Sequence, residues 1–181
     1  MWFRSPTEIL NHYIATNQAK GITMQYRYIT SSAGQLLLAG NENGLEVIEF
    51  VNGSGVGVPK LDWQHNGHCF KEAEQQLNEY FAGTRKTFDL KLTPTGTEFQ
   101  LVVFGALQSI PFGETRSYLQ IAQQIGRPTA ARAVGAANGK NPLPIVIPCH
   151  RVIGSDGSLT GFSGGLAVKL YLLELEGVEM S

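Results

Sequence analysis

Cysteine is scarce in this chain. Its 181 residues include two, Cys69 and Cys149, which excludes the disulfide-rich framework of small secreted domains and favours a reducing, intracellular setting. No apolar stretch approaches the roughly 18 to 20 residues that a membrane helix needs. The N-terminus also lacks the basic start and apolar run of a signal peptide. We therefore expect a soluble, cytoplasmic protein.

Acidic and basic residues nearly balance, so the formal net charge is −1 at pH 7. The overall composition therefore gives no sign of a nucleic-acid partner. The segment from Glu114 to Arg151 differs, because five basic residues against one acidic residue give it a charge of +4. A local basic surface suits a protein that meets DNA at one face. Chance clustering on a solvated face produces the same pattern.

The first half of the chain predicts an α/β domain. Alternating apolar and polar residues predict strands over 22–28, 35–39 and 45–50, with a loop over 52–59. A helix is expected over 68–82, where apolar side chains form one stripe: Phe70, Ala73, Leu77, Tyr80 and Phe81. We place the domain boundary after this helix. Residues 1–88 should form a small antiparallel sheet plus helix, and residues 89–181 a mostly α-helical domain.

The second half carries the periodicity of several helices. The apolar spacing predicts helices over 97–110, 117–125 and 129–138. Thr129 is a plausible N-cap for the last of these. Two short helices across a Gly/Pro turn form a helix-turn-helix pattern, although many helical hairpins bind nothing. Around Arg132 the last helix is built of small residues, which suits either tight packing against a neighbour or entry into a DNA groove.

Cys149 follows an apolar run at 145–147, expected to be a short strand or a buried turn, and Pro148 ends this run. A thiolate nucleophile needs a nearby base or cation, and His150 is adjacent in sequence. Neighbouring side chains of a strand point to opposite faces, so direct pairing requires a turn, a helix start or a bridging water. The alternative for Cys149 is an inert, buried thiol.

A Cys-His pair works better when a third group orients the imidazole. Glu174 and Glu176 are the nearest downstream candidates, and Asn141 can hold the loop through backbone hydrogen bonds. His65, His68 and Cys69 suggest a metal, but no second cluster completes a tetrahedral set. We therefore expect neither a metal nor a cofactor.

The sequence resembles the O6-alkylguanine-DNA alkyltransferases, also called methylated-DNA–protein-cysteine methyltransferases. Residues 147–152 match the family's Pro-Cys-His-Arg signature. Six further blocks follow the family's order and spacing: Ser117-Tyr118, 131–135, Asn141-Pro142, 155–157, 163–165 and 172–177. The match is strong over 95–178, and the first half resembles the family's first domain in layout and length. The resemblance implies a ribonuclease H-like N-terminal domain and a C-terminal domain with a helix-turn-helix.

By resemblance, Cys149 is the nucleophile that takes the alkyl group from guanine O6. His150 would deprotonate it through a water, Glu176 would orient His150, and Asn141 would brace the turn. Tyr118 would give the leaving guanine a hydrogen bond. The residues implied to form the substrate pocket are Val152, Ser163, Phe162, Gly164, Lys169 and Pro144.

The resemblance also implies binding to duplex DNA through the minor groove, with the damaged nucleotide turned out of the stack. Arg132 would fill the vacated space. The other implied DNA contacts are Tyr118, Thr129, Ala131, Ala133 and Arg151. The protein would act once, as a monomer, because a thioether on cysteine is stable. O4-alkylthymine is expected as a further substrate.

Departures from the family pattern are mild. Phe104 and Tyr171 stand where many members have tryptophan, and Phe162 stands where some have tyrosine, which leaves the alkyl-size preference open. One rival interpretation is a binding module that recognises alkylated DNA without transferring the group, and another is a cysteine hydrolase acting on small molecules. Turnover distinguishes the hydrolase, since a hydrolase cycles and an alkyl acceptor does not.

Overall fold

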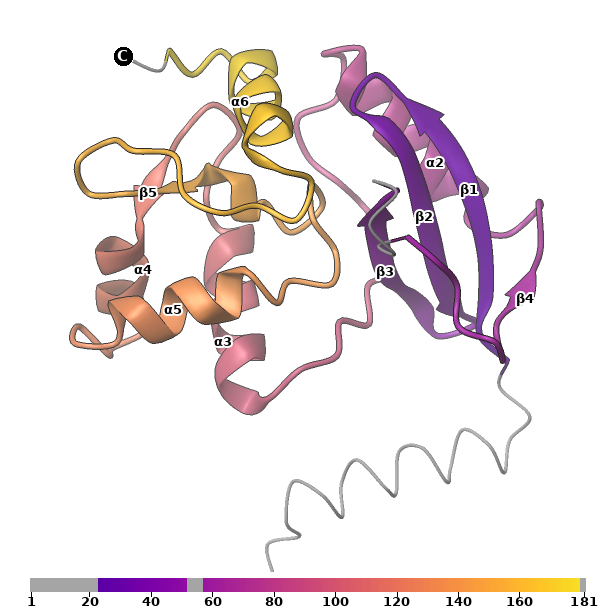
Figure 1. Ribbon diagram of the computed structural model, residues 1–181, viewed down its shortest axis with the longest axis horizontal. Coiled ribbons are helices and arrows are strands. Elements are labelled where there is room, and N and C mark those ends of the chain that lie inside the picture. The colour runs from indigo at the N-terminus through magenta and orange to yellow at the C-terminus, as the bar shows by residue number, and fades with distance from the viewer. Residues whose placement is uncertain (1–22, 52–56, 180–181) are drawn as a thin grey trace, which may run out of the picture.

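The computed structural model describes residues 23–51 and 57–179. Figure 1 shows two units side by side, a twisted sheet with a helix against it and a cluster of helices. The predicted class is confirmed: an α/β unit precedes a mostly helical one. No helix of the described residues has the length and apolarity to cross a membrane.

The sheet has the strand order β3-β2-β1-β4. Strands β1 (Gln25–Ser31), β2 (Gly34–Asn41) and β3 (Gly44–Phe50) are joined by tight turns and pair antiparallel. The short β4 (Gln64–His65) pairs parallel to β1. The sheet is therefore mixed, whereas the sequence predicted an antiparallel one. The first strand begins later than predicted, and residue 22 lies outside the described residues, as does the 52–56 part of the predicted loop.

Helix α2 (Lys71–Phe81) lies along one face of the sheet (Figure 1) and packs against β1. Its stripe of Ala73, Leu77 and Tyr80 is buried, as the spacing predicts. The helix starts three residues later than expected because Phe70 adopts a left-handed conformation, with φ of 53°, which a continuing right-handed helix does not allow. Tyr80 lies in the last turn.

The C-terminal unit holds α3 (Glu98–Gln108), α4 (Tyr118–Gln124), α5 (Ala131–Asn138) and α6 (Leu166–Leu175). Thr97 and Ser117 close capping boxes at the starts of α3 and α4. Helices α4 and α5 pack together as the predicted helix-turn-helix. The predicted cap at Thr129 is wrong: Ala130 occupies the N-cap of α5, and no side chain bonds there.

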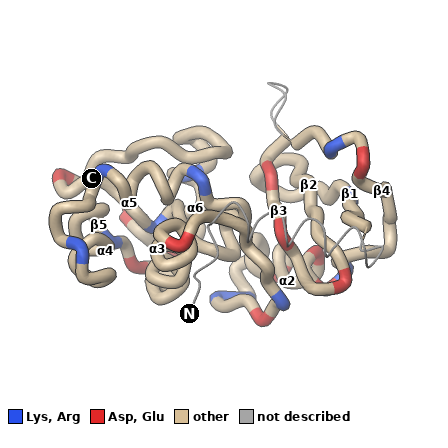
Figure 2. The backbone as a smooth tube through the Cα atoms, turned by 90° about the horizontal axis from the view of Figure 1, so that it is seen from below, with Lys and Arg blue, Asp and Glu red and all other residues tan. Residues whose placement is uncertain are grey.

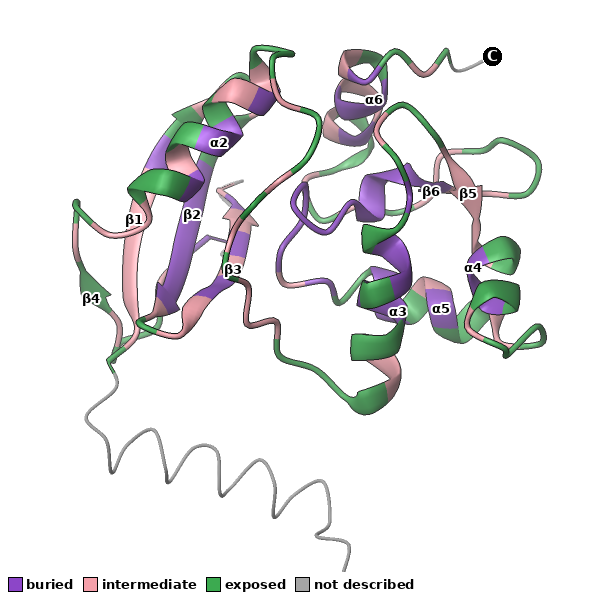
Figure 3. Cartoon of the chain, turned by 180° about the vertical axis from the view of Figure 1, so that it is seen from behind, coloured by how far each residue is buried: buried purple, intermediate pink, exposed green. Residues whose placement is uncertain are grey.

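The segment that carries Cys149 runs through the middle of this unit. A 3₁₀ turn, η1 (Cys149–Arg151), leads into β6 (Val152–Ile153), which pairs parallel with β5 (Arg116–Ser117). Figure 3 shows this segment as buried, in contrast to the exposed outer faces of α4 and α5. The run at 145–147 is a buried turn, which settles the alternatives that the sequence left open.

Candidate active site

The loop that precedes Cys149, residues 141–147, is held by hydrogen bonds of the Asn141 side chain. The Asn141 side chain donates from Nδ2 to the carbonyl of Ile147 at 2.8 Å and accepts from the Leu143 amide at 3.0 Å. Inside this loop Ile145 has φ of 76°, a strained value for a β-branched residue. Asn141 thus satisfies two buried backbone groups of a turn that lacks regular structure. This agrees with the bracing role expected for it.

The thiol of Cys149 is almost enclosed, with 3% of the residue exposed. Burial raises the pKa of Cys149 to about 11, because the thiolate loses hydration. A hydrogen bond from the Asn141 side chain, the Lys169 ammonium and nearby backbone groups act in the opposite direction. At neutral pH the resting side chain is therefore a thiol, and its activation requires a base.

His150 is the base nearest to Cys149 in the chain, and it is fully buried. Its Nε2 lies 2.8 Å from Oε1 of Glu176. Burial lowers the pKa of His150, and the Glu176 carboxylate opposes this shift. Nδ1 has no hydrogen-bond partner among the described residues. A neutral imidazole with its proton on Nε2 can therefore accept a second proton at Nδ1.

Glu176 is the carboxylate that the fold selects from the two candidates, since Glu174 is exposed. Both oxygens of Glu176 are saturated with donors. Oε1 accepts from Tyr80 Oη at 2.7 Å, His150 Nε2 at 2.8 Å and Arg151 Nη2 at 2.9 Å. Oε2 accepts from Arg151 Nε at 2.8 Å and the Gly113 amide at 3.2 Å.

The pKa of Glu176 reflects this surrounding. Burial pushes it upward, but hydrogen bonds from His150 and Arg151, together with their charges, outweigh burial and lower it to about 2. Glu176 is therefore a carboxylate at any physiological pH. It can stabilise an imidazolium on His150 as the histidine takes up a proton.

The prediction that Arg151 contacts DNA is wrong for this structure. Its Nε and Nη2 bond to Glu176, and Nη1 donates to the Ile110 carbonyl at 2.6 Å. The side chain is buried, so the guanidinium is not available to a phosphate. Arg151 instead holds Glu176 in the orientation that serves His150.

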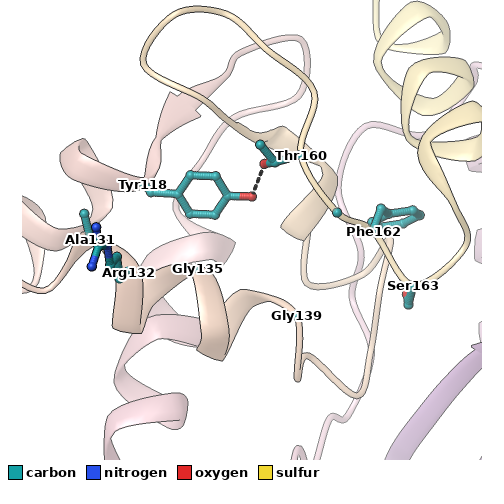
Figure 4. A pocket seen from close by; sticks show the side chains of 9 residues that line it. Tyr118, Ala131, Arg132, Gly135, Gly139, Thr160, Phe162 and Ser163 are labelled. Atoms are coloured by element: carbon teal, nitrogen blue, oxygen red, sulfur yellow. Dashed lines mark hydrogen bonds between the residues drawn. The ribbon is translucent and has the colours of Figure 1, made fainter.

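A pocket of about 670 Å³ opens beside this network. Figure 4 shows Ala131, Arg132 and Gly135 of α5 on one side, with Phe162 and Ser163 of the loop before α6 on the other. The hydroxyls of Tyr118 and Thr160 lie 2.7 Å apart across the pocket. Ala131 and Gly135 of α5 add little bulk to this wall, and a Cβ at Gly135 would stand in ordinary van der Waals contact with the Tyr118 ring, at 3.6 Å.

Three side chains connect the pocket wall to the buried network. The Phe162 ring packs edge-on against His150, with centroids 6.3 Å apart. Asn138 of α5 donates to the Cys149 carbonyl at 3.4 Å. Lys169 donates from Nζ to the carbonyls of Val152 at 2.6 Å and Thr160 at 3.0 Å. The pocket and the thiol therefore share one set of supports.

Of the six residues predicted to form the substrate pocket, Phe162 and Ser163 line it within the described part of the chain. Val152, Lys169 and Pro144 are buried and are not among its lining residues. Gly164 packs against Phe50, where an added Cβ would stand 2.9 Å from the ring. These four support the wall and do not form its surface.

The residues predicted to contact DNA lie mostly on α5 and the turn before it. Thr129, Arg132 and Ala133 are exposed, and Ala131 is partly exposed. The basic segment is less uniform than its sequence suggests, because Arg151 is buried and Arg116 pairs with Glu114 at 2.8 Å. Figure 2 shows basic positions in both units, so charge by itself does not mark one face.

Two residues of the site escaped the sequence analysis. In the sequence Tyr80 occupies one of the apolar positions of the α2 stripe, and the neighbouring residues do not indicate that its hydroxyl bonds to Glu176. Thr160 lies in an irregular loop with no pattern to mark it. Among the described residues no group of His, Cys, Asp and Glu side chains could hold a metal ion.

Comparison with known proteins gives consistent matches over both units. A family model described as 6-O-methylguanine DNA methyltransferase, ribonuclease-like domain, matches residues 24–94. A second, described as 6-O-methylguanine DNA methyltransferase, DNA binding domain, matches residues 98–178. A methylated-DNA–protein-cysteine methyltransferase of Methanosarcina acetivorans is 52% identical over 155 residues, covering 85% of this chain and 99% of that protein.

Solved structures give the same result. The structure of Mycobacterium tuberculosis OGT in complex with DNA has a TM-score of 0.79 and 49% identity, covering 84% of this chain and 92% of that chain. The O6-methylguanine-DNA methyltransferase of Pyrococcus kodakaraensis shares the fold, with a TM-score of 0.61 at 23% identity, covering 86% of this chain and 100% of that chain.

Proposed function

The chain belongs to the 6-O-methylguanine DNA methyltransferase family, whose members are methyltransferases that repair DNA by moving the methyl group onto a protein cysteine, and we propose that Cys149 is the acceptor here. The observation that carries this assignment is the buried His150–Glu176 pair, whose histidine follows Cys149 directly in the chain. Cys69 lies in a different setting, since it is partly exposed and its thiol donates to the Asn66 carbonyl at 3.0 Å.

The reaction begins with the removal of the thiol proton. His150 is neutral and accepts the proton at Nδ1, directly or through one water, while Glu176 stabilises the imidazolium. The thiolate attacks the alkyl carbon on guanine O6 in line with the breaking bond. A sulfur–carbon bond forms, the carbon–oxygen bond breaks, and its electron pair stays with the guanine.

The leaving guanine is stabilised as its charge develops. Tyr118 points into the pocket, and we assign its hydroxyl the hydrogen bond to the guanine ring. The hydroxyl lies 2.7 Å from the Thr160 hydroxyl, so it can accept from Thr160 while it donates its proton to a bound base. The product thioether is stable, so the protein acts once.

The substrate is O6-alkylguanine in duplex DNA. Its target atom is inaccessible in the stack, so the nucleotide must rotate out at a cost of a few kcal/mol. The pocket has the volume of a small-molecule site. Arg132 is exposed on α5 at its rim, and we assign it the space that the nucleotide vacates. Thr129, Ala131 and Ala133 lie beside it on the face assigned to the minor groove.

Transfer stoichiometry tests the proposal. The protein is incubated with excess duplex carrying one radiolabelled O6-methylguanine, beside Cys149→Ser and Cys69→Ser variants. We expect one label per chain, located on Cys149 by peptide mass, a plateau at that ratio, and loss of label in Cys149→Ser alone. Continued turnover would indicate a hydrolase, and lesion binding without transfer would indicate a sensor.

Finer points of the proposal are separate. We propose that the protein is a cytoplasmic monomer with domains at 1–88 and 89–181, and that it also accepts O4-alkylthymine. A duplex carrying labelled O4-methylthymine, offered in the same assay, tests the second substrate. Sedimentation equilibrium tests the monomer, and a mass of twice the chain would overturn it.

A further inference from the structure

Tyr80 presents a buried hydroxyl that packing does not explain. The side chain is fully buried, and its ring lies against Phe81 and Phe88 at 5.5 Å and Phe112 at 6.2 Å. A phenylalanine would make these ring contacts equally well. The hydroxyl crosses from the sheet-bearing unit to the C-terminal unit and donates to Glu176 Oε1 at 2.7 Å.

This hydroxyl touches both members of the acid–base pair. It shares Oε1 of Glu176 with Nε2 of His150, and its own oxygen lies 3.5 Å from that Nε2. Every acceptor near Nε2 therefore favours a proton there. That tautomer leaves Nδ1, which has no hydrogen-bond partner among the described residues, free to accept a proton.

We propose that Tyr80 is a positioning residue for alkyl transfer, whose hydrogen bond to Glu176 keeps His150 neutral and able to take the thiol proton. The inference rests on the proposed function. A carboxylate oxygen with three donors spreads its charge over all of them. With Tyr80 removed, more of that charge faces His150, and the imidazolium forms at higher pH.

The surrounding charges fit this role. The titratable and charged groups that act on the His150 ring are Glu176, Arg151, Lys169 and Tyr80, and Tyr171 also acts on Tyr80. The Cys149 thiol interacts with the backbone of His150. Arg151 and Lys169 disfavour an imidazolium, whereas Glu176 favours it. Burial and the Glu176 charge raise the pKa of Tyr80, so the hydroxyl remains a donor throughout the range in which histidine titrates.

The variant Tyr80→Phe keeps the ring and removes the hydrogen bond. Its matched control is Tyr28→Phe, which removes a hydroxyl that donates to the Gly57 carbonyl at 3.0 Å, in the same unit. A second control, Phe88→Leu, disturbs the ring packing and keeps the hydroxyl. Single-turnover transfer is measured against pH, and the His150 imidazole is titrated by NMR in the DNA-free protein.

In Tyr80→Phe we expect the acid limb of the rate profile and the imidazole midpoint to move by about one pH unit to higher pH. The transfer rate below that limb falls by about tenfold. Both controls should keep the wild-type midpoints. Unchanged midpoints in Tyr80→Phe, or an equal shift in Phe88→Leu, would overturn the inference. If the wild-type protein does not label Cys149, the proposed function fails, while the imidazole titration still decides the effect of Tyr80 on His150.

Discussion

At Glu176 one buried carboxylate serves the imidazole of His150, the guanidinium of Arg151, the hydroxyl of Tyr80 and a backbone amide. A buried charge is tolerated when it is paired and fully hydrogen-bonded. Removing one partner is costly, because the others remain buried without compensation. Under the proposed function, we therefore expect Glu176 to matter both for alkyl transfer and for the stability of the fold.

Glu176→Gln should lower the free energy of unfolding by about 3–5 kcal/mol, because Arg151 is left without its counter-charge in the interior. Transfer to Cys149 should fall with it, since His150 loses the carboxylate that stabilises its protonated form. Chemical denaturation measures the first effect and single-turnover labelling the second. The control is Glu174→Gln on the exposed neighbour, which should stay within about 0.5 kcal/mol of wild type. Equal losses in the two variants would contradict the assignment.

At the scale of elements, the helices of the C-terminal unit begin in two ways: α3 and α4 with capping boxes, α5 and α6 without a side-chain cap. Helix α3 starts with a reciprocal capping box, in which Gln100 N donates to Thr97 and Thr97 N donates to the Gln100 side chain. Helix α5 starts without a side-chain cap. An uncapped N-terminus leaves backbone amides free, which suits a helix whose start faces an anionic partner.

Thr97→Ala should reduce the free energy of unfolding by about 1 kcal/mol, because the cap of α3 is lost. Thr129→Ala should leave it unchanged, since Thr129 caps no helix in the structure. Thermal and urea unfolding of the two variants make the comparison. If Thr129→Ala lowered the free energy of unfolding as much as Thr97→Ala does, the N-cap role predicted for Thr129 from the sequence would be supported.

Arg132→Ala should slow alkyl transfer from duplex DNA by about tenfold or more, because the vacated stack is left unfilled and the cost of rotating the nucleotide, a few kcal/mol, is no longer offset. Transfer from a single-stranded oligonucleotide carrying the same lesion should change little, since no stack must be opened. Single-turnover rates on the two substrates give the ratio. Equal slowing on both would assign Arg132 to general electrostatic binding.

At the scale of the whole molecule, the network around Glu176 joins the two units, because Tyr80 comes from α2 and its partners come from η1 and the end of α6. Phe88 and Phe112 close the apolar side of the same junction around the Tyr80 ring. Loss of charge on Glu176 should therefore loosen the junction as well as the site.

Stability should fall as the pH drops from about 4.5 to about 2, the interval between the ordinary pKa of a glutamate and that of Glu176 in the fold. In this interval the unfolded chain binds more protons than the folded protein, so protons favour unfolding. The free energy of unfolding, measured by urea denaturation across the interval, should decline more steeply in wild type than in Glu176→Gln. Parallel declines would show that other carboxylates dominate.

The sequence by itself determined the fold class and the positions of most elements. Hydrophobic periodicity is a local property, so it predicts β2, β3, α3 and α4 without tertiary information. The resemblance rests on side chains such as Cys149 and His150, which are adjacent and can be recognised as a motif. The start of α2 and the cap of α5 were misjudged, because a left-handed Phe70 and an unused Thr129 leave no mark in the pattern.

Only the tertiary structure decided how the groups meet. In the folded protein Glu176, and not Glu174, bonds to His150, and Arg151 points inward to Glu176. Lys169 bonds to the Val152 carbonyl, and Tyr80, 96 positions away in the sequence, bonds to the Glu176 carboxylate. These contacts depend on the direction of each side chain after packing. The donors that surround a buried carboxylate are those that packing brings close to it, and the spacing of residues along the chain does not specify which donors these are.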